Sequence, residues 1–182
     1  MKTRPLNRRI KRSILLILAV CIAVCGTAVA GNRDTALQRA IELYNAGSYT
    51  QSIEILKRRL NEAKDSKDKR TEAVVCNNLG NNYSQTGNVV EALAAYQQAA
   101  KIAYAAGDLR MSARAEKNIG ALYSDGKDFE RALQQFEKAE AIARSTGDTP
   151  VLADCANNRG VIYEQHNNFG KSLQCYEEAM KL

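Results

Sequence analysis

The side chains that could perform chemistry are few, and their spacing does not match a known active site. His166 is the only histidine, and it lies in a polar segment at residues 165–168 that predicts a solvent-facing turn. No serine has the sequence context of a nucleophile elbow, and no glycine-rich segment matches a phosphate-binding loop. The acidic residues mostly stand beside lysine or arginine, as they do on solvated helix surfaces. The sequence therefore predicts a protein that is not an enzyme and uses no cofactor.

The cysteines do not form a metal-binding pattern. Cys21 and Cys25 lie in the first 30 residues, and Cys76, Cys155 and Cys175 lie in the rest of the chain. No CxxC motif or Cys/His pair is present, so no metal site is expected. We expect the last three cysteines to pack as small apolar residues between helices. A disulfide between Cys155 and Cys175 stays open as an alternative, because both fall on the same predicted hairpin.

The most regular polar feature is a column of three asparagines at 40-residue intervals, Asn78, Asn118 and Asn158, called the asparagine column below. A primary amide offers a donor and an acceptor together, so each side chain could contact a ligand or equally satisfy backbone groups nearby. Arg114 and Lys117, one helical turn apart, add positive charge that could receive a carboxylate, although solvation of both is the simpler interpretation. The candidate binding residues are Asn77, Asn78, Asn81, Arg114, Lys117, Asn118, Asn157 and Asn158.

These asparagines belong to a repeated pattern that covers most of the chain. Each copy holds two apolar helical stripes, with three- and four-residue spacing, separated by a short turn. The three clearest copies read NLGNNYSQTGNVVEALAAYQQA, NIGALYSDGKDFERALQQFEKA and NRGVIYEQHNNFGKSLQCYEEA, starting at the residues of the asparagine column. One hairpin cannot bury both of its apolar faces alone, so neighbouring hairpins must stack to complete a core. The repeat therefore predicts an all-α domain.

Five further columns of the repeat carry small and aromatic residues. They are Gly80, Gly120 and Gly160; Tyr83, Tyr123 and Tyr163; Ala92, Ala132 and Ser172; Tyr96, Phe136 and Tyr176; and Ala99, Ala139 and Ala179. Together with Leu79 or Ile119 before the glycine, this pattern resembles the tetratricopeptide repeat. The resemblance implies a right-handed α-solenoid of stacked antiparallel helix hairpins. The chain departs from the family signature in having no tryptophan and in placing Arg159 in the leucine column.

The period of 40 residues is also longer than the 34 residues of the family signature, so the helices next to the inter-repeat turn should be about one turn longer. In this respect the chain resembles kinesin light chains and related long-repeat members. In such members the asparagine of this column binds the backbone of an extended peptide, and the first helices of the hairpins line a concave groove. The resemblance therefore implies a peptide or protein partner in that groove.

The expected domain covers residues 31–182 and contains four hairpins. Their approximate bounds are 33–66, 73–106, 113–146 and 153–182. The first hairpin is a degenerate copy, as terminal repeats usually are. Gly107 and Gly147 suit the left-handed position after a helix, and the aspartate that follows each of them suits the N-cap of the next helix.

The last hairpin has no polar capping helix after it in the sequence. Cys175, Tyr176 and Met180 should therefore form an apolar end face. Either the chain is a fragment, or this face meets a partner or another copy of this chain.

Residues 1–30 look like a secretory signal peptide. A basic segment, an apolar run and a small-x-small motif ending at Ala30 follow one another, so cleavage would leave Gly31 as the first residue. A membrane anchor through residues 14–30 is the alternative, because the uncharged stretch of 18 residues is near the minimum that spans a bilayer. The expected location is secreted or periplasmic, with membrane anchoring as the alternative.

The formal charge of +6 does not indicate a nucleic-acid partner. Six of the 26 basic residues and none of the 20 acidic residues lie in the first 30 positions, so the remaining chain is neutral. No basic stripe is left to bind a phosphate backbone, and no nucleic-acid partner is expected. The predicted function is an exported, non-enzymatic scaffold that binds a peptide or protein in its concave groove. The alternative is a truncated sensory or input region of a membrane-anchored receptor with the same repeats.

Overall fold

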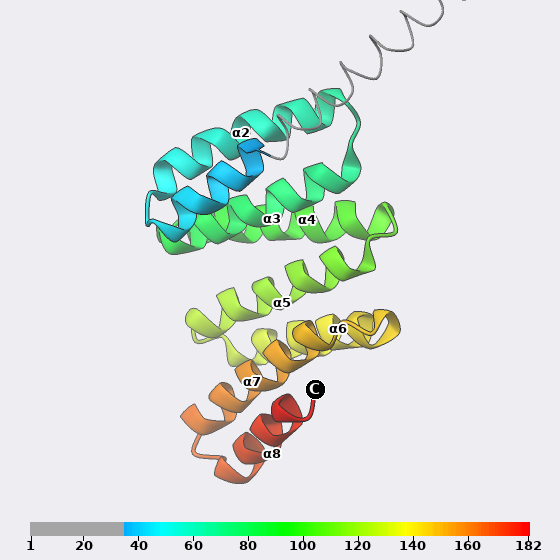
Figure 1. Cartoon of the computed structure of the whole chain (residues 1–182). Coiled ribbons are helices and arrows are strands. Elements are labelled where there is room, and N and C mark those ends of the chain that lie inside the picture. The colour runs from blue at the N-terminus through cyan, green and yellow to red at the C-terminus, as the bar shows by residue number, and fades with distance from the viewer. Residues whose placement is uncertain (1–34) are drawn as a thin grey trace, which may run out of the picture.

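The computed structural model describes residues 35–182, and this part of the chain is built from helices without any strand. A first helix spans residues 35–45, and it is followed by α2 (Tyr49–Asp65), α3 (Lys69–Gln85), α4 (Val89–Ala105), α5 (Leu109–Asp125), α6 (Phe129–Thr146), α7 (Thr149–Gln165) and α8 (Phe169–Met180). The helices pair into four antiparallel hairpins, stacked from the blue first helix to the red α8 (Figure 1). The expected all-α, right-handed α-solenoid is confirmed.

None of the described helices combines the length and the apolar character needed to cross a bilayer. Residues 1–30, for which a signal peptide or an anchor is predicted, lie outside the described residues.

The turns recur every 20 residues, and each contains one residue in the left-handed backbone region. These residues are Gly47, Lys67, Gly87, Gly107, Lys127, Gly147 and Asn167. The expected left-handed glycines at 107 and 147 are confirmed, with φ values of 74° and 63°. In the turn that contains Gly126, the left-handed residue is instead Lys127, with a φ of 61°. The position after each helix thus sets the turn geometry even where no glycine supplies it.

The last three hairpins start earlier than the approximate bounds expected from the sequence. Helices α3, α5 and α7 begin four residues before the approximate bounds at 73, 113 and 153. Asp68 and Asp108 explain two of these starts, because each accepts a hydrogen bond at 3.1 Å from the backbone N–H three residues further on. Asp148 makes no such bond, and α7 instead carries Pro150 in its first turn, where a backbone donor is not needed.

The glycine column exists because an aromatic ring from the same hairpin lies against each glycine. A Cβ atom added to Gly120 would lie 2.7 Å from the ring of Phe136, and one added to Gly160 would lie 2.6 Å from the ring of Tyr176. Gly80 has the same relation to Tyr96. The missing Cβ therefore lets the two helices of each hairpin approach across a flat ring.

The first hairpin solves the same contact with different residues. Ala40 stands where the later repeats have glycine, and Leu56 stands where they have an aromatic ring. Both residues are buried, and they belong to one cluster of packed side chains. Ser52 adds a hydrogen bond at 2.8 Å to the carbonyl of Ala40, which ties α2 to the first helix. In the first hairpin, the absence of the aromatic ring thus coincides with the replacement of glycine by the larger alanine on the opposing helix.

The three cysteines of the described chain are free, buried thiols. Cys155 and Cys175 do not form the disulfide considered as an alternative, and the expectation of simple packing is confirmed. Burial raises the pKa of the Cys76 thiol to about 11 and that of the Cys155 thiol to about 12. These thiols are therefore protonated and unreactive at neutral pH.

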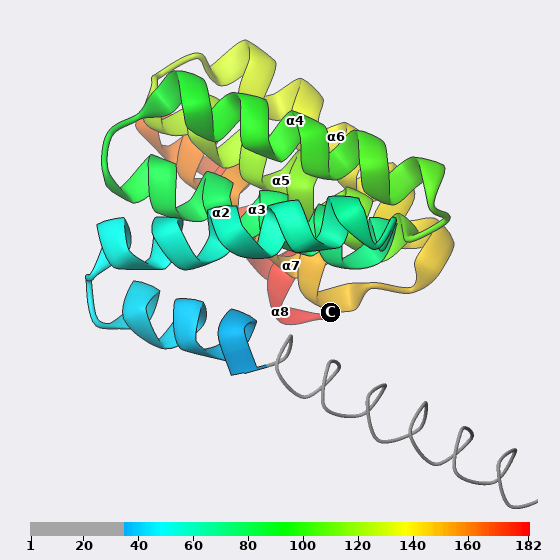
Figure 2. The same ribbon diagram turned by 90° about the horizontal axis from the view of Figure 1, so that it is seen from above.

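The stack is curved, with the first helix of each hairpin on the inside. The backbone of α3 lies close to that of α5, and that of α5 lies close to that of α7, whereas the backbones of α2, α4, α6 and α8 do not approach one another closely. The more closely spaced set of helices lies on the inner side of the bend, so α3, α5 and α7 line the concave surface. A view along the stack shows that successive hairpins are rotated relative to one another (Figure 2).

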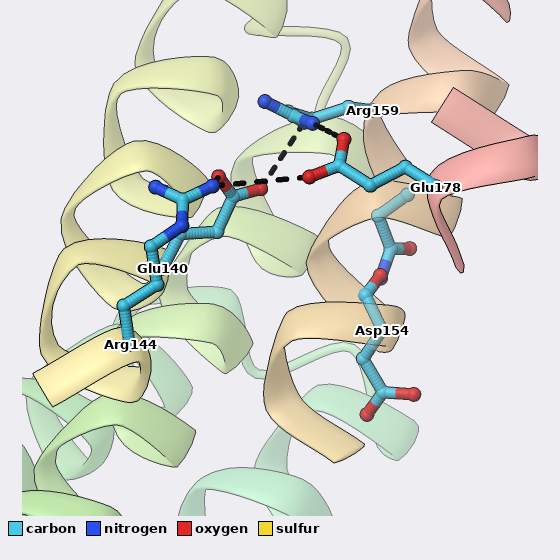
Figure 3. A network of polar contacts seen from close by, with 6 residues as sticks. Glu140, Arg144, Asp154, Arg159 and Glu178 are labelled. Carbon is cyan, nitrogen blue, oxygen red and sulfur yellow. Dashed lines mark hydrogen bonds and ion pairs between the residues drawn. The ribbon is translucent and has the colours of Figure 1, made fainter. Parts of the chain in front are cut away.

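A network of four charged residues holds the last hairpin to the one before it (Figure 3). Arg159 of α7 pairs with Glu140 of α6 at 3.2 Å and with Glu178 of α8 at 2.7 Å. Arg144 pairs with Glu140 at 3.1 Å. Desolvation raises the pKa of the buried Glu140 carboxyl even though two arginines oppose the shift. Arg159 therefore departs from the leucine of the family signature because it bridges three helices.

The C-terminal end face is only partly as expected. Cys175 is buried and Tyr176 is half-buried, whereas Met180 is 79% exposed. Leu173 and Phe169 of α8 add further exposed apolar area. Self-association through this face stays a prediction.

Candidate peptide-binding groove

The asparagine column places one amide on each of the three inner helices α3, α5 and α7. Asn78 donates from Nδ2 to the carbonyl oxygen of Val74 at 3.0 Å, and Asn158 donates to that of Asp154 at 2.7 Å. Both bonds stay within one helix. These two side chains therefore do not connect neighbouring hairpins.

Asn118 behaves differently, because its amide connects α5 to α3. Its Nδ2 donates to Oδ1 of Asn77 at 3.0 Å and to Oδ1 of Asn81 at 3.4 Å. Oδ1 of Asn81 also accepts a hydrogen bond from the hydroxyl of Tyr96 at 2.9 Å. Asn77, Asn81 and Asn118 thus form a polar network between two hairpins, in which side-chain amides brace the inner surface.

All three amides of the column nevertheless keep one free acceptor. Each makes its hydrogen bonds through Nδ2, and no described residue donates to the Oδ1 atom of Asn78, Asn118 or Asn158. Each of these side chains is only half-buried. The concave surface therefore presents carbonyl oxygens at 40-residue intervals, which suits acceptance of backbone N–H groups from an extended chain.

The candidate cations of the groove differ in how they are paired. Lys117 of α5 forms an ion pair with Asp154 of α7 at 3.0 Å, so its charge is compensated within the groove. Arg114 is exposed and has no hydrogen-bond or ion-pair partner among the described residues. Asn157 is likewise exposed. Of the two predicted cations, Arg114 is the one whose guanidinium is free to bind a carboxylate.

A pocket of about 210 Å³ opens at the N-terminal end of the groove. It is lined by Ile41, Tyr44, Asn45, Asn78, Asn81 and Asn82, with Ala40, Ser52 and Leu56 beneath them. Asn82 was missed by the sequence reasoning, although it is only 1% exposed and donates to the carbonyl oxygen of Asn78 at 2.8 Å. Its repeat position offered a clue, because the later copies have Leu122 and Ile162 there, both buried. This end of the groove is therefore more polar than the repeat pattern requires.

The remaining chemistry-bearing residues do not converge on a site. His166 donates from Nδ1 to the carbonyl oxygen of Ile162 at 2.8 Å, and its ring lies edge-on to that of Phe129, with 4.7 Å between the ring centroids. Within residues 35–182, no group of three or more His, Cys, Asp or Glu side chains is arranged to hold a metal ion. The groove is therefore the candidate site that the sequence and the structure share.

The fold and this groove define a class: a helical-repeat protein that presents a concave polar surface. Sequence models of the tetratricopeptide repeat match residues 73–106 and residues 111–182, which together make up more than half of the chain. The chain belongs to the tetratricopeptide repeat family. The repeats make it a protein–protein interaction scaffold, in a family that generally binds protein or peptide partners and is generally not enzymatic.

Solved structures with the same fold have low sequence identity to this chain. The crystal structure of MamA superposes with a TM-score of 0.60 at 19% identity, covering 82% of this chain and 77% of MamA. The crystal structure of BtubC (BKLC) from P. vanneervenii superposes with a TM-score of 0.70 at 22% identity, covering 82% of this chain and 62% of BtubC. A putative kinesin light chain of Podosopora anserina with nearly identical TPR-like repeats superposes with a TM-score of 0.65 at 14% identity, covering 80% of this chain and 72% of the kinesin light chain. Comparison with curated proteins gives no match.

Proposed function

We propose that this chain is an exported scaffold that binds an extended peptide segment in its concave groove. The observation that carries the proposal is the row of unpaired Oδ1 atoms on Asn78, Asn118 and Asn158. Side-chain carbonyls at a fixed interval can accept hydrogen bonds from the backbone N–H groups of a peptide, and such contacts do not depend on the peptide's side chains. Arg114 adds a free guanidinium that suits an acidic group or a C-terminal carboxylate.

The three amides of the column do not have equal roles in this proposal. Asn78 and Asn158 bond only within their own helices, so their replacement should affect the ligand more than the fold. Asn118 also connects α5 to α3, so its replacement should affect both. The double variant N78A/N158A is therefore the clean test of peptide binding.

The experiment starts from peptides selected on the purified chain from a random peptide library. Loss of two hydrogen bonds at about 0.5–1.5 kcal/mol each should weaken binding of a selected peptide by roughly five- to 150-fold. The melting temperature of N78A/N158A should stay near that of the parent, whereas N118A should melt earlier. Asn61→Ala, on an exposed position of α2, is the matched control. Undiminished binding to N78A/N158A would mean that the selected peptides use another surface.

Export is supported by the composition of residues 1–30, a basic segment followed by an apolar run and a small-x-small motif. N-terminal sequencing of the protein from its native host tests this part. A mature start at Gly31 supports a cleaved signal peptide. An intact N-terminus in the membrane fraction would support the anchored alternative.

A further inference from the structure

The three junctions between successive hairpins are built at equivalent repeat positions but are filled differently. Leu60, Ala100 and Glu140 occupy one column, 40 residues apart. At the first junction Leu60 packs into the core clusters on either side of α3. At the last junction Glu140 belongs to the charged network with Arg159 that bridges α6, α7 and α8 (Figure 3).

The middle junction is left open, because Ala100 is too small to fill it. A cavity of about 530 Å³ lies there between α4 and α6, with α5 as its floor. The backbones of α4 and α6 do not approach each other closely, and side chains of both helices line the opening between them. Its apolar lining includes Ala100, Ile119 and Ile142, with the rings of Tyr104 and Tyr123 beside them. The volume falls in the range of ligand-binding pockets.

One buried carboxylate lies in this apolar cavity. Glu116 has a side chain only 7% exposed, and its Oε1 pairs with Nζ of Lys138 at 2.6 Å. No described residue donates a hydrogen bond to its second oxygen. The neighbouring repeats have Cys76 and Ala156 in this column, so the carboxylate is peculiar to the junction that holds the cavity. The second oxygen of Glu116 is therefore available to a ligand that donates a hydrogen bond. Oε1 of Gln135, which also lines the cavity, is a buried acceptor without a partner. Leaving such an acceptor unpaired is costly, and a donor on a ligand would remove that cost.

The charge of the cavity favours a neutral ligand. Lys138 already compensates Glu116, and Lys101 adds a further positive charge to the lining. A cationic ligand would therefore meet an excess of positive charge. An anionic group could pair with Lys101, but it would repel the Glu116 carboxylate and could not donate a hydrogen bond to its second oxygen. A large apolar group with a single neutral N–H or O–H donor fits both the volume and the charge, which is the character of indole and phenol side chains.

The cavity is independent of the asparagine groove. Its residues on α5 follow three- and four-residue spacing, namely Ser112, Glu116, Ile119 and Tyr123. Arg114 and Asn118 lie on the opposite side of the same helix, by its 3.6-residue repeat. One helix thus separates a concave polar groove from an outer apolar cavity.

We propose that this outer cavity binds an aromatic side chain with a neutral donor, in particular a tryptophan, presented by a partner protein. The indole ring fills the space that Leu60 fills at the first junction, and its N–H donates to the free oxygen of Glu116. The site is a second contact point for a protein partner, on the face opposite the concave groove.

The probe is N-acetyl-tryptophanamide. The protein is added to it in increasing concentration while the indole fluorescence of the probe is recorded. The chain contains no tryptophan, so selective excitation reports only on the probe. We expect saturable binding that Ala100→Leu weakens at least tenfold, because the leucine occupies the cavity as Leu60 does in its own junction. Ala94→Leu, on an exposed position of the same helix, should bind like the parent. Absence of saturable binding to the parent would overturn the proposal, as would unchanged binding to a folded A100L variant.

A second comparison tests the hydrogen bond and does not depend on how A100L folds. The 1-methylindole analogue of the probe lacks the donor, and it should bind the parent roughly three- to tenfold more weakly. Glu116→Ala, which installs the residue found at position 156, should bind both probes equally. If the parent fails to distinguish the two probes, Glu116 does not receive the indole N–H and the assignment of this ligand class is wrong.

Discussion

The contact between Gly120 and Phe136 gives a sharp test of how the hairpins are packed. A methyl group at position 120 would lie 2.7 and 2.8 Å from two ring carbons of Phe136. Phe136 is fully buried, so its ring cannot move into solvent to relieve the overlap. Gly120→Ala should therefore overpack the hairpin. In the first hairpin, Ala40 stands at the position of Gly120 and Leu56 at that of Phe136, so a leucine partner tolerates a methyl group there.

The expected magnitudes follow from this geometry. Overpacking costs about 1–3 kcal/mol, and the better helix propensity of alanine offsets about 0.5–1 kcal/mol of that cost in Gly120→Ala. Phe136→Leu alone should cost about 1–2 kcal/mol, because it leaves a small cavity beside the glycine. In the double variant the new methyl group occupies part of that cavity. Its cost should be lower than the sum of the two single costs by about 1 kcal/mol or more.

Urea denaturation followed by circular dichroism measures the four free energies of unfolding that this cycle needs. Gly160→Ala is the matched control, because its partner Tyr176 is only half-buried and its ring can shift outward. We expect Gly160→Ala to cost less than Gly120→Ala. Additive costs in the Gly120 and Phe136 cycle, within about 0.3–0.5 kcal/mol, would refute the idea that the ring requires the glycine.

Three further predictions follow from burial and charge. Ala139→Leu should lower stability by about 1–3 kcal/mol because the alanine is fully buried, whereas the exposed Glu137→Gln should not; equal thermal melting of both would contradict the assigned helix faces. With raised thiol pKa values, Cys76 and Cys155 should react with a thiol reagent at pH 8 only after unfolding, and fast native labelling of either would disprove their burial. Because the pKa of Glu140 is raised in the fold, the stability of the parent relative to Glu140→Gln should be greatest below its ordinary value of about 4.5 and fall as the pH rises through the raised value. A relative stability that instead rises over that pH range would show that the arginines outweigh desolvation.

Much of the fold follows from local features of the sequence. The repeat columns that contain Gly120 and Phe136 correctly predicted the helix faces, because three- and four-residue spacing determines which side chains share a face. The glycine at 107 correctly marked a left-handed turn, since that backbone region favours glycine. The resemblance to the tetratricopeptide repeat then supplied the stacking order and its right-handed sense, which the residues by themselves do not contain.

The roles of individual polar residues were decided by the tertiary structure. The sequence gives Asn78, Asn118 and Asn158 the same repeat position, yet only Asn118 reaches a neighbouring helix, because its partners Asn77 and Asn81 lie on α3. Likewise, Arg159 departs from the repeat pattern in the sequence, and its role is evident only in the structure, where it pairs with one carboxylate on α6 and one on α8.

The outer cavity has the same origin. Ala100 is an ordinary small residue in the sequence, and it opens a cavity only because α4 and α6 are held apart over α5. Helical periodicity determines which face of a helix each side chain occupies, and that is local. Which amide is bonded, which charge is paired and which junction stays open depend on contacts between residues about 20 to 40 positions apart, and these exist only once the hairpins have stacked.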